Sequence, residues 1–265
     1  MVETSKSVPR REVGGTVSIP VTPKLSGPVV HVWRVSLEVP VAVRRLCATW
    51  LGDDEQARVA SFQVERLRRQ FIVRRGLRRA LLADYLGVRP QDLRFAYGSK
   101  DKPRLTGEPA GAPLQFNCSH SAEMALIAVT RGREIGIDLE RMRDGVRCEE
   151  IAARYFAPAE AAALASEPRR TRRALFFQYW TGKEAWIKAE GGGLSIPLQE
   201  FEVQLRSKDD PAPITSSANP AGNPLGYVYR LNVAGGYAAA VVAAEPGVKI
   251  LLRDWTPEIA ASGGR

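Results

Sequence analysis

The sequence contains little cysteine and little histidine. Among its 265 residues are 3 cysteines and 2 histidines. Cys47, Cys118 and Cys148 lie far apart, and the sequence has no C-x-x-C pair or Cys/His cluster. This spacing argues against a zinc site and a disulfide framework. It is typical of a protein kept in a reducing cytoplasm, which is the location we expect.

Long hydrophobic runs are also missing. Residues 1–27 contain no apolar segment of the signal-peptide kind, and no later segment reaches the roughly 18 apolar residues of a membrane span. We therefore expect neither export nor a membrane span. Residues 1–27 are rich in proline, glycine, serine and charge, which predicts a disordered leader.

The chain has an excess of positive charge. Its 38 Lys+Arg against 29 Asp+Glu give a formal net charge of +9. This excess indicates an anionic partner, which could be nucleic acid, a phosphorylated small molecule or an acidic protein, unless the charge serves only solubility. The sequence has no C2H2 spacing, RNP-like aromatic motif or basic-region heptads, so we do not expect nucleic acid as the partner.

Two successive parts of the chain share one outline. After a predicted strand in "VVHVWRVSL", residues 53–86 are expected to form a helix, followed by a turn region and strands. Helices are expected again in "EEIAARYFAPAEAAALAS" and "RRALFFQYWTGKEAWIKAEG", followed by turns and strands. This predicts an α+β fold of two similar subdomains, residues 28–141 and 142–256, with a cleft at their seam and a flexible tail at 257–265.

The first predicted helix has arginines on its apolar side. At about 100° per residue, Arg74 and Arg78 fall inside the stripe that contains Phe71 and Leu77. Arginines on a core face need anionic partners. They either pair with internal carboxylates or help to line a phosphate site, and the sequence leaves both alternatives open.

The segment "REIGIDLERMRD" contains two carboxylates that could bind a metal. In a strand, Asp138 and Glu140 share one face while Ile135, Ile137 and Leu139 share the other. Neighbouring carboxylates repel, and a hard divalent metal between them would remove that repulsion. A solvated strand end with arginine counter-charges is the alternative, because D-x-E is a weak signal.

A third carboxylate lies in "FFQYWTGKEAWIKAEGGGL". Glu184 falls within the helical stripe of Phe177, and Lys188 lies just beside it, whereas a solvated Glu-to-Lys pair would occupy the opposite face. Asp138, Glu140 and Glu184 would together supply three oxygen ligands for Mg²⁺, leaving positions for water and phosphate.

Further polar residues are suited to the remaining phosphate charge. His120 in "FNCSHSAEM" is either a structural hydrogen-bonding residue or, with its polar neighbours, a phosphate contact. His31 is expected to be structural. The candidate basic residues are Arg58, Lys100, Lys102 and Lys188.

Four segments in order, "GSKDKPRL", "FNCSHS", "IGIDLERMR" and "FFQYWTGKEAWIKAEGGGLSIPL", resemble the 4'-phosphopantetheinyl transferases of the surfactin-synthetase-activating (Sfp) type. The resemblance implies a monomeric pseudo-dimer of two similar α+β subdomains with the active site in the seam. It also implies Mg²⁺-dependent transfer, with Mn²⁺ possible, of the phosphopantetheine arm of coenzyme A to a serine of an apo acyl or peptidyl carrier protein. The other product is 3',5'-ADP, and the carrier would serve fatty-acid, polyketide or nonribosomal-peptide synthesis.

Carried over position by position, the resemblance implies roles for individual residues. Mg²⁺ would bind Asp138, Glu140 and Glu184, while Lys188 would lie near the pyrophosphate and the reacting hydroxyl. The catalytic set implied in this way is Glu184, Lys188 and Glu160, the last matching an acidic position proposed as a general base in some members.

The coenzyme A contacts implied by the family are basic and hydroxyl side chains. Because "GSKDKP" has two lysines where many members have one, the main lysine contact is left open. Glu55 departs from the pattern, since some relatives have a basic residue there. The implied contacts are Arg58, Arg75, Lys100, Lys102, Ser119, His120 and Lys188.

Two other functions would also account for the three carboxylates or for the excess of positive charge. Another Mg²⁺-dependent phosphoryl or nucleotidyl transferase would need the three carboxylates but not the "FNCSHS" and "WTGKEAWIK" segments. A basic RNA- or DNA-binding protein would need none of the three, and its binding would fall steeply with salt.

Overall fold

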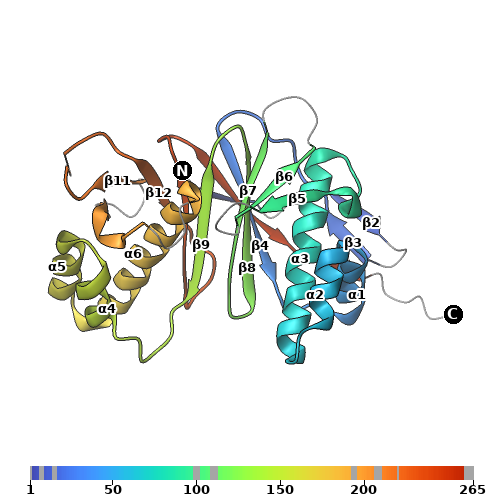
Figure 1. Ribbon diagram of the computed structural model, residues 1–265, viewed down its shortest axis with the longest axis horizontal. Helices are drawn as coiled ribbons and strands as arrows, with labels where there is room; N and C mark the ends of the chain where they lie inside the picture. The colour runs from blue at the N-terminus through green and yellow to red at the C-terminus, as the bar shows by residue number, and fades with distance from the viewer. Residues whose placement is uncertain are drawn as a thin grey trace.

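The computed structural model describes residues 2–5, 9–13, 17–97, 102–107, 113–191, 196–205, 211–219 and 221–259. Within these ranges, two five-stranded sheets lie next to each other in the middle of the molecule, with helices on their outer sides (Figure 1). Because each half combines its own sheet with its own helices, the predicted α+β class with two similar subdomains is confirmed.

The first sheet mixes parallel and antiparallel strands. Both neighbours of its strand β14 run parallel to it, and the other pairs are antiparallel. Its spatial order is β1 (Val2–Ser5), β14 (Lys249–Trp255), β4 (Val29–Ser36), β8 (Met124–Arg131) and β7 (Leu114–Ser121).

The second sheet is antiparallel throughout. Its spatial order is β10 (Phe201–Val203), β11 (Ala212–Ser216), β12 (Gly226–Arg230), β13 (Tyr237–Ala243) and β9 (Ile135–Arg141). Thus β9 belongs to the second sheet although its residues fall in the first predicted subdomain, and β14 belongs to the first sheet although its residues fall in the second.

Helices cover the outer face of each sheet. On the first sheet these are α1 (Val41–Thr49), α2 (Asp53–Ala60) and α3 (Glu65–Leu86), and on the second they are α4 (Cys148–Tyr155), α5 (Pro158–Ser166) and α6 (Arg169–Glu190). Both long helices end in a glycine with positive φ, Gly87 and Gly191, a conformation that glycine adopts without strain. Short 3₁₀ turns lie at Pro90–Asp92 and Leu198–Glu200, and β5 (Arg94–Tyr97) forms a hairpin with β6 (Pro103–Thr106).

Two of the predicted helices are interrupted. The helix expected over residues 53–86 breaks before Val64, whose backbone is extended, so that α2 and α3 are separate. The other break lies at Phe156 and Ala157, which are both extended, and Pro158 disfavours helical geometry at Ala157, the residue before it.

Apolar side chains form a core on each face of the sheets. One cluster joins the first sheet to α1 and α3, with Trp33, Val73 and Leu77 among its members, and a second joins the second sheet to α4–α6. A third contains Val32 of β4 together with Ile137 of β9, so the two sheets also pack on each other. The layers therefore run helices, sheet, sheet, helices.

The expectation of a disordered leader at residues 1–27 is wrong where the structure describes them. β1 extends the first sheet, while β2 (Arg10–Val13) and β3 (Val17–Pro20) form a small sheet with β15 (Glu258–Ile259). Val17 and Ile19 are buried in the first core, so they contribute apolar contacts that the proline- and glycine-rich composition concealed. β15 falls in the predicted tail, whose residues 260–265 lie outside the described ranges.

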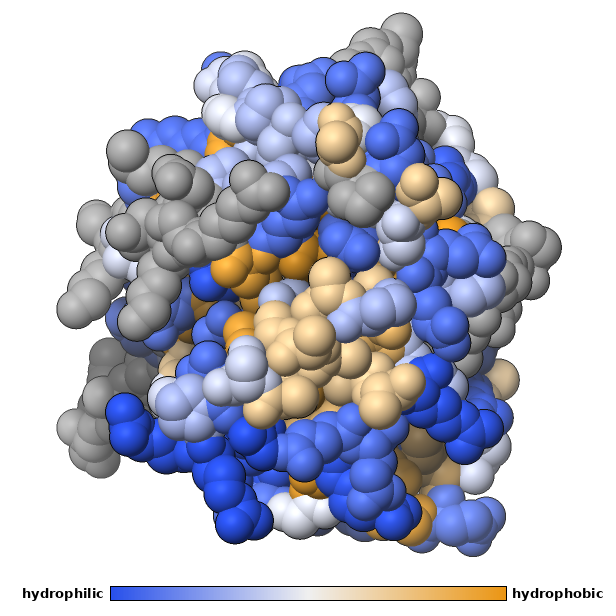
Figure 2. Space-filling view, turned by 90° about the vertical axis from the view of Figure 1, so that its left-hand side faces the viewer, coloured by the Kyte–Doolittle hydropathy of each residue, from blue (hydrophilic) through white to orange (hydrophobic). Residues whose placement is uncertain are grey.

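The end of the molecule that bears α4–α6 shows an apolar area surrounded by hydrophilic surface (Figure 2). Leu164 of α5 is buried against the second core, while Ala159, Ala162 and Ala165 are exposed. In the described part of the chain, no helix is long and apolar enough to cross a membrane.

Candidate active site

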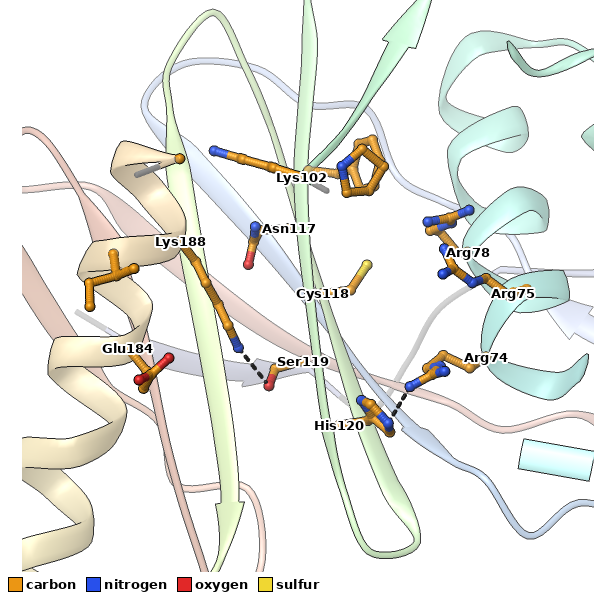
Figure 3. Close-up of a pocket in the computed structure, with 14 residues that line it drawn as sticks. Arg74, Arg75, Arg78, Lys102, Asn117, Cys118, Ser119, His120, Glu184 and Lys188 are labelled. Atoms are coloured by element: carbon orange, nitrogen blue, oxygen red, sulfur yellow. Dashed lines mark hydrogen bonds between the residues drawn. The ribbon is translucent and has the colours of Figure 1, made fainter. Parts of the chain in front are cut away.

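A pocket of about 390 Å³ lies between α3 and α6, with β7 between them (Figure 3). The arginines of α3 face it from one side, and Glu184 and Lys188 of α6 face it from the other. Lys102 lies at one end and His120 near the other. The pocket is therefore bounded by both halves of the molecule, as predicted for the seam.

The motif "FNCSHS" forms β7 and connects it to β9. Asn117 Oδ1, Ser119 Oγ and Ser121 Oγ accept hydrogen bonds from the backbone N–H groups of residues 137, 139 and 141, at 3.1, 3.2 and 3.0 Å. Side chains two residues apart in a strand share a face, so this alternation places all three toward β9. On this edge of β9, opposite the edge that pairs with β13, polar side chains rather than a strand backbone satisfy the N–H groups.

Asp138 lies at the centre of the site and is buried, with 4% of its surface exposed. Its Oδ1 accepts hydrogen bonds from Lys188 Nζ at 2.6 Å and from Ser119 Oγ at 2.9 Å. Its Oδ2 is buried and has no hydrogen-bond partner among the described residues. A buried, unpaired carboxylate oxygen is costly unless a ligand satisfies it.

The other two candidate ligands are electrostatically coupled to Asp138. Burial raises the pKa of Glu140 above its usual value. The hydrogen bond from Ser121 lowers this pKa, and the charge of Asp138 raises it. Burial also raises the pKa of Glu184, as do the charges of Asp138 and Glu140, while Lys188 opposes the shift. The three carboxylates therefore repel one another, and a cation near them would relieve this repulsion.

The three side chains do not form a ready-made metal cluster. Within the ranges that the structure covers, no group of three His, Cys, Asp or Glu side chains is arranged to hold a metal as it stands. Asp138 Oδ1 contacts Lys188 instead. Hard carboxylate oxygens are nevertheless the donors that Mg²⁺ prefers, and Asp138 Oδ2 is available as one of them. In donor chemistry, then, the residues fit the metal.

A glycine allows α6 to approach β9 closely. A Cβ atom on Gly136 would lie 1.9 Å from the backbone oxygen of Ala185 and 2.5 Å from the backbone nitrogen of Ala189. Only glycine fits at such a distance, and the resulting contact brings Glu184 and Lys188 beside Asp138. Sequence reasoning missed this residue, although an isolated glycine within a strand pattern can signal a close backbone approach.

The arginines of α3 form a cationic wall, defined as Arg74, Arg75 and Arg78. Arg78 pairs with the buried carboxylate of Glu55 at 2.8 Å, whereas Arg74 contacts the ring of His120. The first alternative left open by the sequence is therefore confirmed for Arg78, which has an internal carboxylate partner, while all three arginines line the pocket and their role at a phosphate site stays a prediction. Burial, reinforced by Arg75, lowers the pKa of Arg74 to about 10.

His120 is held in its neutral form by its surroundings. Burial lowers its pKa to about 4, and the charges of Arg74, Lys188 and Arg75 add to this shift. A neutral imidazole offers one donor and one acceptor, so it can accept a hydrogen bond from an arginine and donate one to an anion.

Lys102 spans the seam at the end of the pocket. Its Nζ donates to Glu134 Oε2 at 2.8 Å and to the backbone oxygen of Ala189 at 3.0 Å. Lys102 therefore lines the pocket, although its charge is already paired with Glu134, and its contact with coenzyme A stays a prediction. Lys100 lies outside the described residues.

Two of the predicted site residues lie elsewhere. Arg58 is exposed on α2, where its guanidinium lies over the ring of Phe62, and it is not among the residues that line the pocket. Glu160 is buried in the second half, where its carboxylate contacts Lys183 Nζ at 2.7 Å and accepts from the backbone nitrogen of Val203 at 2.7 Å. The structure thus does not bring Glu160 to Glu184 and Lys188, and its general-base role stays a prediction.

The two halves of the molecule meet at a seam that contains the pocket. The cationic wall lies on one side of it, and Glu184 and Lys188 lie on the other. This arrangement is suited to an anionic ligand. Comparison with known proteins identifies the class. Residues 134–242 match the family described as the 4'-phosphopantetheinyl transferase superfamily, and residues 42–132 match 4'-phosphopantetheinyl transferase, N-terminal.

Individual relatives agree with the family matches. The chain is 43% identical over 176 residues to 4'-phosphopantetheinyl transferase HetI of Nostoc sp. strain PCC 7120, covering 66% of this chain and 74% of that protein. It is 31% identical over 208 residues to 4'-phosphopantetheinyl transferase Sfp of Bacillus subtilis strain 168, covering 74% and 88%. The solved structure of Thermotoga maritima holo-[acyl-carrier-protein] synthase matches 43% of this chain and 63% of its own at 24% identity, with a TM-score of 0.33.

The chain therefore belongs to the 4'-phosphopantetheinyl transferase family. This confirms the resemblance found in the sequence, together with the predicted enzyme class.

Proposed function

We propose that this transferase moves the 4'-phosphopantetheine arm of coenzyme A to a serine of an apo acyl or peptidyl carrier protein, with Mg²⁺ as the metal and 3',5'-ADP as the second product. The observation that carries the proposal is the opposition of charge across the pocket. The cationic wall of α3 faces Glu184 and Lys188 of α6 across the pocket, and Lys188 in turn pairs with the buried Asp138 of β9. A bound pyrophosphate would be attracted to the cations and connected to the carboxylates only through a metal.

The residues that would hold Mg²⁺ are Asp138, Glu140 and Glu184. Asp138 Oδ2 is buried and unpartnered among the described residues, and the raised pKa values of the other two follow from burial and mutual repulsion. The metal would supply charge stabilisation for the phosphate oxygens. Mn²⁺ prefers similar oxygen ligands and would fit the same donors.

The chain's own residues would position the substrate and move its proton. Lys188 Nζ lies 3.1 Å from Ser119 Oγ and can stabilise negative charge on the breaking pyrophosphate. A carboxylate at the site, acting directly or through water, would take the proton of the carrier's serine. The cationic wall and His120 would bind the phosphates of the adenosine end.

The proposed partners and location follow from charge and composition. The net charge of +9 would attract an acidic carrier protein to the seam, and the attraction would weaken with salt. Both halves of the pocket come from one chain, so a monomer would suffice. The three unpaired cysteines favour a reducing cytoplasm.

Intact-mass spectrometry of an apo carrier protein tests this function. The carrier is incubated with this protein, coenzyme A and Mg²⁺, and a parallel sample contains EDTA. A gain of about 340 Da that is lost with EDTA is the expected result. Coenzyme A binding without transfer to any of several carrier types would contradict the proposed acceptor, and transfer of a nucleotidyl or single phosphoryl group would point to the other transferase reaction.

A further inference from the structure

Glu55 of α2 is a buried carboxylate shared by two neighbouring arginines of α3. Its Oε1 accepts from Arg78 at 2.8 Å, and its Oε2 accepts from Arg79 at 2.5 Å. Side-chain exposure is 3% for Glu55 and 4% for each arginine, so all three groups are removed from water. Removing one member of such a buried group leaves the others with uncompensated charge.

The two arginines have different surroundings. Arg79 donates to the backbone oxygens of Pro90 and Leu93, at 3.0 and 3.1 Å, and thus connects α3 to the turn that follows it. Arg78 instead lines the pocket, and both guanidinium groups lie over the ring of Phe95, that of Arg78 at 4.3 Å from the ring centre and that of Arg79 at 5.1 Å. Its Nε is buried without a hydrogen-bond partner among the described residues. Arg78 is therefore held between a carboxylate and a ring, with donor capacity left over.

Glu55 is itself fixed in place. It accepts a hydrogen bond from the backbone N–H of Gly52 at 3.2 Å, which closes the N-terminus of α2. A Cβ atom on Gly52 would lie 2.4 Å from a guanidinium nitrogen of Arg79, so a larger residue there would displace the arginine. The start of α2 thus fits closely around the pair of arginines.

We propose that Glu55 is a positioning residue for coenzyme A: it holds the guanidinium of Arg78 in the pocket, oriented toward the anionic end of the ligand. This inference rests on the proposed function. Pre-ordering of a long side chain lowers the entropy lost when the ligand binds. Glu55 is paired with Arg78 and Arg79 and is not among the residues that line the pocket, so its charge is not presented to the ligand.

The charge of Glu55 and its contact with Arg78 should have opposite effects on coenzyme A binding. Glu55 repels an anion, so its neutralisation should strengthen coenzyme A binding if charge alone matters. If Glu55 positions Arg78, the same change should weaken binding, because a glutamine has only one acceptor oxygen for two guanidinium groups and presents donors to the other. The sign of the effect therefore separates the two accounts.

Isothermal titration of Glu55→Gln with coenzyme A and with 3',5'-ADP is the test. We expect both ligands to bind about tenfold more weakly, with KM for coenzyme A rising in parallel and kcat changing much less. Glu65→Gln is the matched control, because Glu65 also pairs with two arginines of α3, Arg68 and Arg69, but on the exposed surface. The control should change binding by less than about twofold, since exposed charges are screened.

Unchanged or tighter binding by folded Glu55→Gln would overturn the proposal and leave Glu55 with a stabilising role only. If Glu55→Gln does not fold, Glu55→Asp replaces it: this variant keeps the charge, so weaker binding must come from displaced arginines, and unchanged binding would overturn the proposal. Failure of the wild-type protein to bind coenzyme A would instead contradict the proposed function.

Discussion

Lys188 of α6 and Asp138 of β9 form an ion pair with 2.6 Å between Nζ and Oδ1. Ser119 of β7 joins them, since its Oγ donates to the same Oδ1 and accepts from the same Nζ. A strand of the first sheet, a strand of the second sheet and the long helix of the second half thus meet at three side chains.

Replacement of Lys188 by alanine should reduce turnover more than ligand binding. Lys188 is placed to stabilise charge that develops on the pyrophosphate, whereas the cationic wall still binds the ground state. We expect kcat to fall about 100-fold or more, with the Kd for coenzyme A rising less than tenfold. Lys249→Ala, which removes an exposed lysine paired with Glu3, is the control. A pure binding defect in Lys188→Ala would assign this lysine to substrate recognition.

Glu184→Gln should abolish Mg²⁺-dependent transfer while the protein stays folded. The change removes one negative charge from the proposed metal site, and it also relieves repulsion with Asp138 and Glu140, so stability should not fall. Turnover and Mg²⁺ affinity would be measured beside the thermal midpoint. Glu190→Gln, at the exposed end of the same helix, should behave as wild type. Full activity in Glu184→Gln would remove this residue from the metal site.

Gly136→Ala should force α6 away from β9 and so impair both stability and turnover. Overpacking of this kind costs about 1–3 kcal/mol. Gly76→Ala is a matched control, since its Cβ would lie 2.4 Å from the backbone oxygen of Cys47, at the contact of α1 and α3. We expect the control to lower the thermal midpoint but to leave kcat of the folded enzyme nearly unchanged. Equal kcat in both variants would mean that the helix-to-strand distance at Gly136 does not set the site geometry.

Glu160→Gln should destabilise the protein by about 3 kcal/mol, because it leaves the fully buried Lys183 without its charge partner. Lys183 also donates to the backbone oxygens of Leu198 and Phe201, so its displacement would disturb the start of β10. Urea denaturation measures the loss. Activity per folded molecule then tests the role implied by the family: a large fall in kcat without loss of stability would support Glu160 as a general base, against its position in the structure.

Acidification should destabilise the protein through His31. Its Nδ1 lies 2.8 Å from the hydroxyl of Tyr85, which accepts a hydrogen bond from Trp33 and can donate its own proton to the neutral ring. Burial, with the charge of Arg253, lowers the pKa of His31 from 6.5 to about 4. The unfolded chain therefore takes up a proton between these values while the folded chain does not, and stability present above pH 6.5 is lost as the pH falls toward 4.

The expected loss from His31 is up to about 3 kcal/mol. Thermal midpoints between pH 7.5 and 4.5 would measure it. His31→Asn keeps an acceptor for Tyr85 but cannot be protonated, so its midpoint should fall less over this range. Parallel curves for the wild type and the variant would show that His31 does not contribute.

Much of the fold and the site could be predicted from local patterns. Alternation identified the strand of Asp138 and Glu140, and helical periodicity placed Glu184 beside Lys188 on a buried face. The same periodicity marked Arg74 and Arg78 as arginines that need anions. Residues 17–20 were missed because only three or four residues alternate there, and their burial depends on the sheet that they join.

The sequence by itself determined the residue types of the site, the α+β class and the family, because periodicity and motif order are local properties of the chain. Only the tertiary structure decided which charges meet. It placed Glu55 against Arg78 and Arg79, 23 and 24 residues away, and Glu160 against Lys183 rather than in the pocket. Burial energies depend on what surrounds a side chain in space, and spacing along the chain does not encode those surroundings.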